Sequence, residues 1–280
     1  MAPEVFAMVL GAALLHAAWN ALVKVNTDRL IMVGIMMTSQ IAIATMALPF
    51  VAFPTPQAWP FIFYSTALHT AYFSFLVLAY RYGDLSHVYP IARGVAPLIV
   101  AVVSVVIVGE VLSYPAMLAV VAVALGIMSL SLTRSAYGLG ESKAILYALG
   151  TGVFIAGYTI VDGLGARHAA SAHSYIFWLN IFDGIPITIL ALYLRWGQVL
   201  TEVRRSWKPG VLAGIVSLLA YWIVLWAMTL APLAMVSAVR ETSMVFAVLF
   251  GVIFLKEKLN TARLISISIT LFGVVFLKIS

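Results

Sequence analysis

The chain has no cysteine and few charged residues. The absence of cysteine among the 280 residues excludes disulfides, thiolate metal sites and a cysteine nucleophile. Only 9% of the residues are charged and 64% are hydrophobic, whereas about a quarter of the residues of an average soluble protein are charged. Such a chain cannot cover a globule in water, so we predict an integral membrane protein whose functional site lies inside a helix bundle.

The sequence also lacks the signatures of common enzyme active sites. It contains no His-Glu-x-x-His helix, no Gly-x-Ser-x-Gly elbow, no Walker loop and no lysine in the middle of an apolar run. Asp162 and Asp183 are candidates for an intramembrane aspartyl pair, but nothing in the sequence brings them together, and Asp162 lies near the predicted end of its span. We therefore expect no catalytic residue, no cofactor, no metal and no enzyme activity.

Lysine and arginine outnumber aspartate and glutamate by 16 to 10, an excess that in a soluble protein would suggest nucleic acid as a partner. Most of these basic residues lie at the ends of apolar runs, where they orient the chain and meet anionic lipid. The first 19 residues contain Glu4 and no basic residue, so we interpret them as part of a retained span rather than a signal peptide. The expected partners are a lipid bilayer and a small molecule, not nucleic acid.

Apolar runs broken by charge, proline or glycine predict ten membrane spans of about 20 residues each. The spans cover residues 5–24, 30–53, 60–80, 86–108, 113–132, 144–162, 174–194, 211–230, 233–255 and 261–279. The connections are short except at residues 195–210, where two tryptophans and four basic residues predict a segment lying at the lipid headgroups.

The distribution of basic residues predicts an orientation for the bundle. Ten spans place both termini on the same side of the membrane. Twelve of the 16 basic residues gather on the opposite side, whereas Arg167 and Lys278 lie on the terminal side. By the positive-inside rule, this count predicts that both termini lie outside the cell.

Weak internal repetition links the two halves of the chain. A shift of 147 residues places Arg93 on Arg240, and the same shift pairs Glu110 with Glu257, Leu112 with Leu259 and Gly126 with Gly273. A shift of 139 residues places Trp19 on Tyr158. Because each copy holds an odd number of spans, five, the second copy enters the membrane in the reversed direction. The fold class we predict is an all-α integral membrane protein of ten transmembrane helices, arranged as an inverted 5+5 repeat around a central cavity, and this architecture favours transport over catalysis.

Charged side chains inside a bilayer are costly, so they are candidates for a functional site. Four qualify, namely Arg93, Asp183, Arg240 and Glu241. The two arginines lie about 12 Å into their spans, and since the spans run in opposite directions we expect them to flank the midplane, one toward each mouth of the cavity. The alternative is a structural lock, in which Arg240 pairs with a carboxylate such as Asp183 or either arginine binds backbone carbonyls.

The fourth and ninth spans supply different chemistry around these arginines. Pro90 and Pro97 remove two amide donors beside Arg93, which predicts a distorted helix with carbonyls exposed to the cavity, or else a kink used only in packing. Tyr89 lies four residues before Arg93 and shares its face. The ninth span has no proline but holds Ser237 and Glu241, so Glu241 could bind an ammonium group or carry a proton.

Aromatic and polar side chains on other spans complete the predicted cavity wall. His16, Trp19 and Asn20 repeat at helical spacing along one face of the first span. Aromatic residues within spans serve in packing or interface belts about as often as they line a cavity, and a lone histidine such as His69 is more often a satisfied core residue. The predicted substrate-binding residues are His16, Trp19, Asn20, Tyr89, Arg93, Tyr158, Tyr221, Trp222, Ser237, Arg240 and Glu241.

Several short motifs in both halves resemble one known family. They are Trp19-Asn20-x-x-x-Lys24, Pro97 followed by an apolar helix ending in Gly109-Glu110, and a second copy ending in Lys256-Glu257. Over essentially the whole chain the sequence resembles the EamA-like transporters of the drug/metabolite transporter superfamily, and among them it is most similar to the amino-acid exporters. The resemblance implies two EamA-like five-helix repeats, at residues 1–135 and 141–280.

The resemblance carries further expectations. It implies a cavity lined chiefly by spans one, three, four, six, eight and nine, with the fifth and tenth spans at the periphery and with Glu110 and Glu257 as structural residues at helix ends. It implies a multi-pass protein of the plasma membrane, the bacterial inner membrane. Relatives keep their termini in the cytoplasm and carry basic residues between spans two and three, whereas residues 54–59 have no charge; here we follow the charge count.

The function expected from the sequence is secondary transport by alternating access, with export of small metabolites such as neutral or aromatic amino acids. A carrier of another solute class, such as phosphonate-type metabolites, nucleobases or organic cations, is the nearest alternative. A non-transporting membrane scaffold or lipid-binding protein is an alternative of another class. Because no nucleotide site is present, uphill transport would depend on an ion or proton gradient or on exchange.

Overall fold

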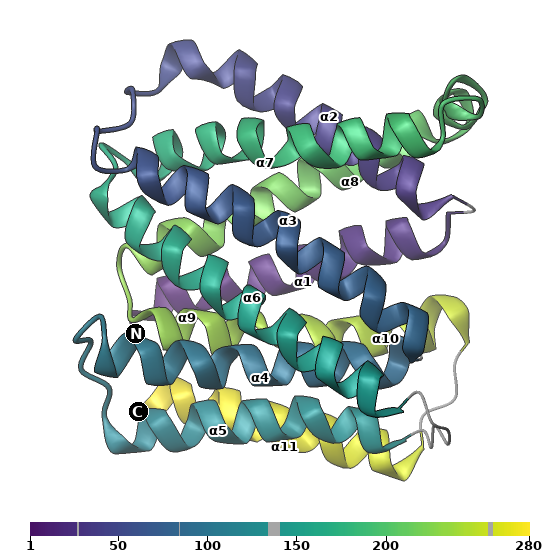
Figure 1. Cartoon of the computed structure of the whole chain (residues 1–280). Helices are drawn as coiled ribbons and strands as arrows, with labels where there is room; N and C mark the ends of the chain where they lie inside the picture. Colours follow the sequence, from purple (N-terminus) through teal and green to yellow (C-terminus); the bar gives the residue numbers. More distant parts are fainter. Residues whose placement is uncertain (27, 84, 134–140, 257–259) are drawn as a thin grey trace.

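A computed structural model describes residues 1–26, 28–83, 85–133, 141–256 and 260–280, and its regular elements are all helical (Figure 1). The α-helices are α1 (Pro3–Lys24), α2 (Arg29–Ala47), α3 (Trp59–Tyr82), α4 (Leu85–Val106), α5 (Tyr114–Ser129), α6 (Glu141–His168), α7 (Ala172–Leu194), α8 (Val199–Met228), α9 (Leu233–Arg240), α10 (Ser243–Leu255) and α11 (Thr261–Ile279). Short 3₁₀ turns follow α2 at η1 (Leu48–Phe50) and α5 at η2 (Leu130–Thr133).

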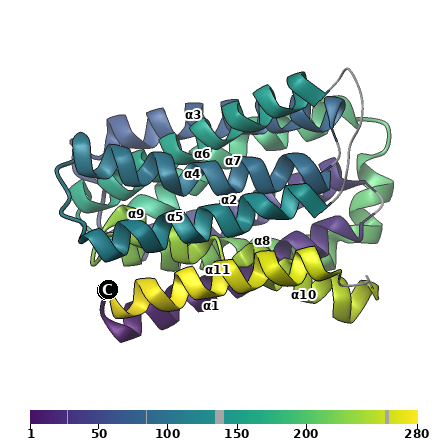
Figure 2. The ribbon, with the colours of Figure 1, turned by 90° about the horizontal axis from the view of Figure 1, so that it is seen from below.

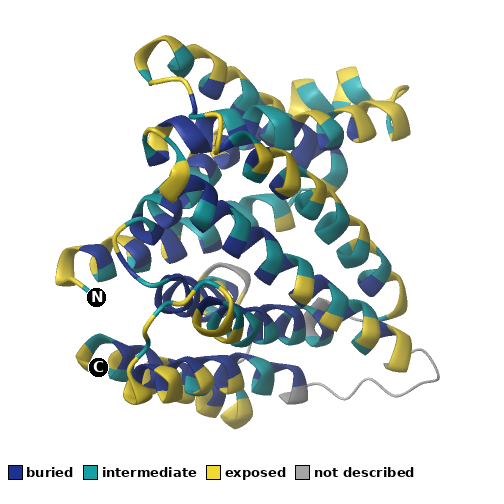
Figure 3. Cartoon of the chain, turned by 60° about the vertical axis from the view of Figure 1, so that its left-hand side comes forward, coloured by how far each residue is buried: buried dark blue, intermediate teal, exposed yellow. Residues whose placement is uncertain are grey.

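Membrane-length helices account for most of the described chain. Nine segments of the described residues are long and apolar enough to cross a bilayer, and α5 is a shorter apolar helix of 16 residues that η2 extends. Large apolar side chains are exposed on the outer faces of the bundle (Figure 3), which suits a surface covered by lipid rather than water. The prediction of an all-helical integral membrane protein is confirmed at this level.

The helices begin where local chemistry satisfies the first free amides of a helix. Asp28 accepts hydrogen bonds from the backbone N–H groups of Leu30 and Ile31 at the start of α2. Ser171 caps α7 and Asn260 caps α11 in the same way. Each of these polar capping residues lies in a connection between two apolar runs. The breaks in hydropathy therefore coincide with the helix starts, and the spans could be predicted from them.

The ninth span is broken, which the sequence did not indicate. Helix α9 ends at Arg240 and α10 begins at Ser243. The Thr242 hydroxyl donates to the carbonyl of Val239 at 2.7 Å, and the Thr242 amide bonds the same carbonyl at 3.0 Å, so the chain tightens into a 3₁₀-like turn. A distortion was expected instead in the fourth span, at Pro90 and Pro97. Both prolines lie inside α4, which is one continuous helix in the structure.

The start of the eighth span is a second correction, whereas the location of residues 195–210 at the headgroups stays a prediction. Residues 195–210 were expected to connect two spans, but α8 begins at Val199 and continues for 30 residues to Met228. Pro209 lies inside this helix. A proline is tolerated there because neighbouring helices can satisfy the backbone carbonyl whose hydrogen bond the proline removes. Most of the predicted connection is therefore the first part of α8.

The helices pack in pairs around a central space. Helix α3 packs along α6 and α1 along α8, while α5 and α11 contact each other at one edge of the bundle (Figures 1 and 2). Both termini lie at the same end of the bundle (Figure 1). The side placement of α5 and α11 is the one that the resemblance implies for spans five and ten.

The inverted repeat stays a prediction, and two features agree with it. An exchange of the two five-span halves would convert the α3–α6 contact into the α8–α1 contact, and both contacts are extensive. The two residues with a left-handed backbone, Gly109 (φ 78°) and Lys256 (φ 54°), are related by the same 147-residue shift. The predicted boundary after residue 135 and the partners Glu257 and Leu259 lie outside the described residues.

Candidate functional site

A cavity of about 850 Å³ lies at the centre of the bundle. Its wall is formed by residues of α1, α2, α3, α4, α6, α7, α8, α9 and α10, and among the described residues none comes from α5 or α11. Helices α2 and α7 contribute to the wall although the resemblance did not include the second and seventh spans. Gln40 comes from α2, and Asn180 and Asp183 come from α7.

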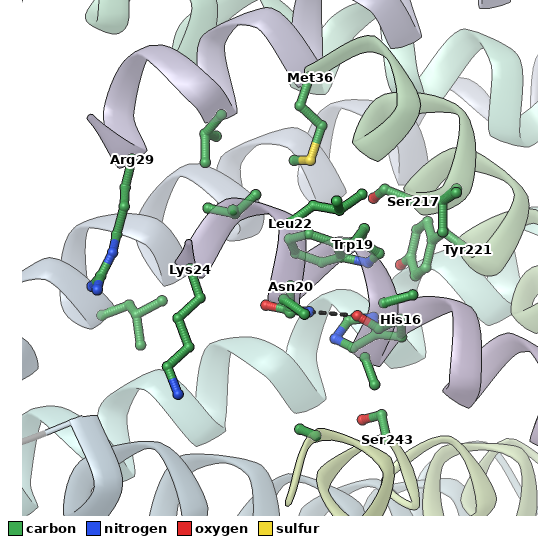
Figure 4. A pocket seen from close by; sticks show the side chains of 18 of the residues that line it. His16, Trp19, Asn20, Leu22, Lys24, Arg29, Met36, Ser217, Tyr221 and Ser243 are labelled. Atoms are coloured by element: carbon green, nitrogen blue, oxygen red, sulfur yellow. Dashed lines mark hydrogen bonds between the residues drawn. The ribbon is translucent and has the colours of Figure 1, made fainter. Parts of the chain in front are cut away.

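The cavity opens toward the end of the bundle that carries most of the basic residues. Its wall includes Lys24 at the end of α1 and Arg29 at the start of α2 (Figure 4). In the other direction it reaches Leu179 and Tyr221, each seven residues from the end of its helix, or about 10 Å. The cavity therefore passes the middle of the bundle and ends before the side that holds the termini.

Two arginines and one glutamate form a buried group at the cavity, which we call the arginine cluster (Arg93, Arg240 and Glu241). Arg93 Nε lies 2.7 Å from Glu241 Oε2, and an Arg240 terminal nitrogen lies 3.4 Å from Glu241 Oε1. The expectation that the arginines flank the midplane toward opposite mouths is wrong, because the break in the ninth span brings both to one carboxylate.

The two arginines of the cluster differ in how well they are bonded. Arg93 also donates to the Ser243 hydroxyl at 2.9 Å, and its guanidinium lies 5.8 Å from the centre of the Tyr89 ring. Arg240 makes its two side-chain hydrogen bonds, to Thr159 and Glu241, at 3.4 Å, and its Nε has no hydrogen-bond partner. Both arginines are 3% exposed and line the cavity, while Glu241 is fully buried behind them. Arg93 Nε also makes no hydrogen bond but is held by its 2.7 Å ion pair with Glu241. The cluster carries one net positive charge, and Arg240 is the less tightly held of its two arginines.

A carboxylate and a histidine lie on another part of the wall. Asp183 Oδ1 is 3.9 Å from His69 Nδ1, and the His69 ring stacks on Tyr158 with 4.0 Å between the ring centres. The His69 Nδ1 also lies 3.1 Å from the Ser65 hydroxyl. Asp183 is therefore not the carboxylate that pairs with Arg240, whereas the general alternative of a carboxylate partner is met by Glu241.

The structure brings most of the predicted site residues to the cavity. Those that line it are His16, Trp19, Asn20, Tyr89, Arg93, Tyr158, Tyr221 and Arg240. Ser237 and Glu241 are fully buried outside the lining, and Trp222 donates its indole N–H to His173 at 2.6 Å and packs on Phe177. Binding of a substrate by these lining residues stays a prediction.

Polar residues of other helices reach the cavity as well, and the sequence analysis did not single them out as site residues. Ser217 and Ser243 appear at the wall in Figure 4, and Tyr72 lies on the same surface. On α7 the spacing of Asn180 and Asp183, three residues apart, places two polar groups on one helical face. That spacing is a signal which could have identified the seventh span as part of the wall.

The opposite end of the bundle is closed by a polar lock between three segments. Arg167 at the end of α6 pairs with Glu110 at 2.6 Å and donates to the carbonyls of Met228 and Ala231 at 2.8 and 3.0 Å. Both Glu110 oxygens accept from the Leu233 amide, the nearer at 2.9 Å. Glu110 thus caps the N-terminus of α9, where a negative charge also suits the helix dipole. No pattern in the sequence indicated that Arg167 is its partner.

An ion pair at the open end joins α2 to α7. Arg195 Nε lies 2.8 Å from Asp28 Oδ2. Burial raises the pKa of Asp28, but the hydrogen bonds from Arg195 and from the Ile31 and Leu30 amides outweigh it, so the pKa lies below its ordinary value of 3.8. Asp28 therefore acts both as a helix cap and as the partner of a cation.

The fold is shared with solved structures. One solved structure, titled only "Crystal structure of protein", superposes with a TM-score of 0.74 over 100% of this chain and 98% of its own, at 15% sequence identity. An identity this low shows likeness of fold alone. No curated protein matches the chain in a sequence comparison.

A family model matches the second half of the chain. Residues 142–279 match the model described as the EamA-like transporter family, a family of membrane transporters without a general enzymatic role. The match does not point to amino-acid exporters in particular. Residues 142–279 therefore resemble membrane transporters, and the helical bundle supports a multi-pass membrane protein.

Proposed function

We propose that the protein is a secondary carrier that exports small zwitterionic metabolites, neutral or aromatic amino acids in the first place, by alternating access. The observation that carries this proposal is the arginine cluster, whose one net positive charge faces a central cavity. A guanidinium that faces a cavity in a membrane protein can bind an anionic group that enters the cavity. The carboxylate of an amino acid supplies one.

Arg240 is the residue that meets the carboxylate. Its Nε has no partner and its other hydrogen bonds are long, so a carboxylate gains charge-assisted bonds without displacing strong ones. Arg93 contributes charge from behind, because it is already held by Glu241 and Ser243. Glu241 is enclosed by the two arginines and has no contact with the cavity, so it does not take the ammonium group.

Asp183 and the aromatic wall receive the rest of the substrate. Asp183 is the carboxylate on the described part of the wall, and its side chain keeps 19% of its surface exposed. It can pair with an ammonium group, while the rings of Trp19, Tyr158 and Tyr221 can stack on an apolar side chain. A volume of about 850 Å³ leaves room for an aromatic amino acid, since small-molecule sites commonly occupy about 300–1,000 Å³.

The direction of transport follows from the charge count. The cavity opens at the end with most of the basic residues, which the positive-inside rule assigns to the cytoplasm. The conformation is then open to the cytoplasm and closed outside, as a carrier that loads its substrate for export would be. We place the protein in a bacterial inner membrane, with residues 1–135 and 141–280 as the two halves that rock around the site.

Counterflow in proteoliposomes tests the proposal. Vesicles loaded with unlabelled amino acid are offered the labelled form, and a panel of neutral and aromatic amino acids is compared with empty vesicles. We expect saturable exchange in the wild type and its loss in Arg240→Gln, which removes the cavity charge and leaves the Arg93–Glu241 pair intact. Arg205→Ala, at an exposed arginine of α8, serves as the matched control and is expected to exchange normally.

Two outcomes would overturn this reading. Full exchange by Arg240→Gln would remove the arginine cluster from the site. No exchange across the panel, from protein shown to be folded by its elution and thermal transition, would exclude amino acids. The same vesicles would then be tested with phosphonates, nucleobases and organic cations, and a lack of exchange with all of them would favour a scaffold or lipid-binding role.

A further inference from the structure

Asp162 is a buried carboxylate that the proposed transport site does not use. It is fully buried on α6, one helical turn beyond the cavity residue Tyr158. Tyr175 donates its hydroxyl to Asp162 Oδ1 at 2.9 Å, and the Tyr221 hydroxyl donates to Asp162 Oδ2. The partners of this carboxylate are two phenols and the Ser65 hydroxyl rather than a cation. An ionisable group of this kind inside a membrane is expensive to keep without a function.

The surroundings of Asp162 include one basic group that two carboxylates share. His69 on α3 faces Asp162 from one side and lies 3.9 Å from Asp183 on α7. The guanidinium of Arg240 contacts α6 at Thr159 and belongs to the arginine cluster. The ionisable groups around Asp162 are thus one imidazole, a second carboxylate and two phenols, supplied by α3, α7 and α8.

The charges inside the bundle balance when one proton is added. The arginine cluster has a net charge of plus one. Asp162 and Asp183 together carry minus two if both are ionised and His69 is neutral, which leaves the interior with one excess negative charge. One proton held by this group removes the excess, and a zwitterionic substrate does not alter the sum. An uncompensated charge at this depth costs several kcal/mol, so the balance favours a single exchangeable proton.

A proton has a route from the cavity to Asp162. Tyr221 lines the cavity (Figure 4), and its hydroxyl bonds Asp162 directly, so the phenol connects cavity water to the buried carboxylate. Helix α6 continues for six residues beyond Asp162, to His168 at the closed end, a distance of about 9 Å. Asp162 therefore lies between the cavity and the closed side, where a group reached from one side at a time would lie.

We propose that Asp162 binds the proton that drives export, one proton entering for each zwitterion that leaves. The inference rests on the proposed function. From the outside the proton adds to the Asp162 carboxylate and forms the neutral acid. In the conformation open to the cytoplasm it leaves through Tyr221 to cavity water, and the carboxylate is restored. Each cycle moves one positive charge inward, so both a pH gradient and a membrane potential would drive it.

The test separates exchange from uphill transport in reconstituted vesicles. Counterflow needs no net proton movement, whereas accumulation against a gradient, driven by an imposed pH difference, does. We expect Asp162→Asn to keep counterflow and to lose pH-driven accumulation of the amino acid that the wild type exchanges. Asp183→Asn, which alters the cavity wall, should lose both, and this contrast separates the proton site from the substrate site.

The other possible results also decide whether Asp162 carries the proton. Accumulation by Asp162→Asn at the wild-type level would overturn the inference, and so would a wild type that exchanges but never accumulates in response to a pH difference. A wild type without exchange would instead defeat the proposed function. If Asp162→Asn loses counterflow as well, Tyr175→Phe decides: it removes one hydroxyl that stabilises the charged carboxylate, and it touches no part of the cavity wall. Its pH profile of accumulation should then move by about tenfold in proton concentration, toward higher pH, and an unmoved profile would overturn the inference.

Discussion

Arg93 on α4 and Glu241 at the break between α9 and α10 form a buried ion pair, with 2.7 Å between Nε and Oε2. The two residues come from opposite halves of the chain, so the pair also ties the two predicted repeats together at the level of the cavity. Because both side chains are almost fully buried, the pair contributes to stability as well as to the charge of the site. Replacement of Arg93 is therefore expected to affect folding as well as transport.

Replacing one partner of that pair is expected to destabilise the protein. Arg93→Ala breaks the short ion pair and leaves Glu241 with the longer contact to Arg240, at 3.4 Å, so it should lower the free energy of unfolding by about 3 kcal/mol, as the loss of one partner of a buried ion pair does. Arg93→Ala combined with Glu241→Ala should cost less than the sum of the two single changes, because the two side chains share one interaction. Thermal transitions in detergent measure both, and a double variant as unstable as the sum of the single variants would contradict coupling between them.

The lock at the closed end should control access from that side. Glu110→Gln weakens the bond to Arg167 and the cap of α9, together about 1–2 kcal/mol. Because the chain has no cysteine, a single Ala234→Cys substitution, at a buried position of α9, reports opening through its reaction with a polar thiol reagent. We expect Glu110→Gln to raise that rate about tenfold.

A matched reporter distinguishes opening from loosening of the whole bundle. Ala21→Cys lies on the cavity wall, at the side that is already open, and its labelling should not rise when Glu110 is changed. An equal increase at both reporters would show that the lock stabilises the fold in general instead of closing one end.

The ion pair of Asp28 predicts how stability depends on pH. The pKa of Asp28 is lowered in the folded chain, against an ordinary value of 3.8, so the stabilisation is present above the unfolded pKa and is lost as the pH falls through the folded pKa. Asp28→Asn should therefore lower the transition temperature near about pH 7 by a few degrees. The difference from the wild type should shrink as the pH falls toward about 3, and a constant difference would show that the carboxylate charge does not matter.

The end of α10 offers a stabilising change. Lys256 adopts a left-handed backbone (φ 54°) where the corresponding position of the first half has Gly109. Such a backbone costs about 1–2 kcal/mol for a residue with a side chain, and glycine avoids that cost but loses up to about 1 kcal/mol in chain entropy. Lys256→Gly should raise the thermal transition slightly. Lys256→Ala, which keeps the strain, is the control and should give no increase.

The sequence predicted the spans well because a bilayer imposes a strong length and hydropathy requirement. It also pointed to Arg93, Arg240 and Glu241, since charge inside apolar runs is rare. The relation between them escaped prediction because it depends on the turn that the Thr242 hydroxyl helps to form. No proline or glycine marks that turn, and hydroxyl bonds to the chain are too common to be read as a break.

Asp162 was misplaced for a different reason. The glycines that follow it, Gly163 and Gly165, resemble a helix end, so the sixth span was predicted to finish at residue 162. In the structure α6 continues to His168, and the two glycines let α6 approach its neighbours, because an added side-chain carbon would collide with Leu233 at the first and with the Tyr175 ring at the second. Glycine in a membrane helix can serve close packing, and the sequence does not separate this use from termination.

Tyr221 belongs to two neighbourhoods, since its ring forms part of the cavity wall and its hydroxyl holds Asp162. A solute stacked on that ring dries the approach to the buried carboxylate, while an empty cavity leaves it wet. Substrate binding and proton transfer thus exclude each other at the Tyr221 ring. A carrier with bound substrate therefore does not leak protons down the gradient that drives transport.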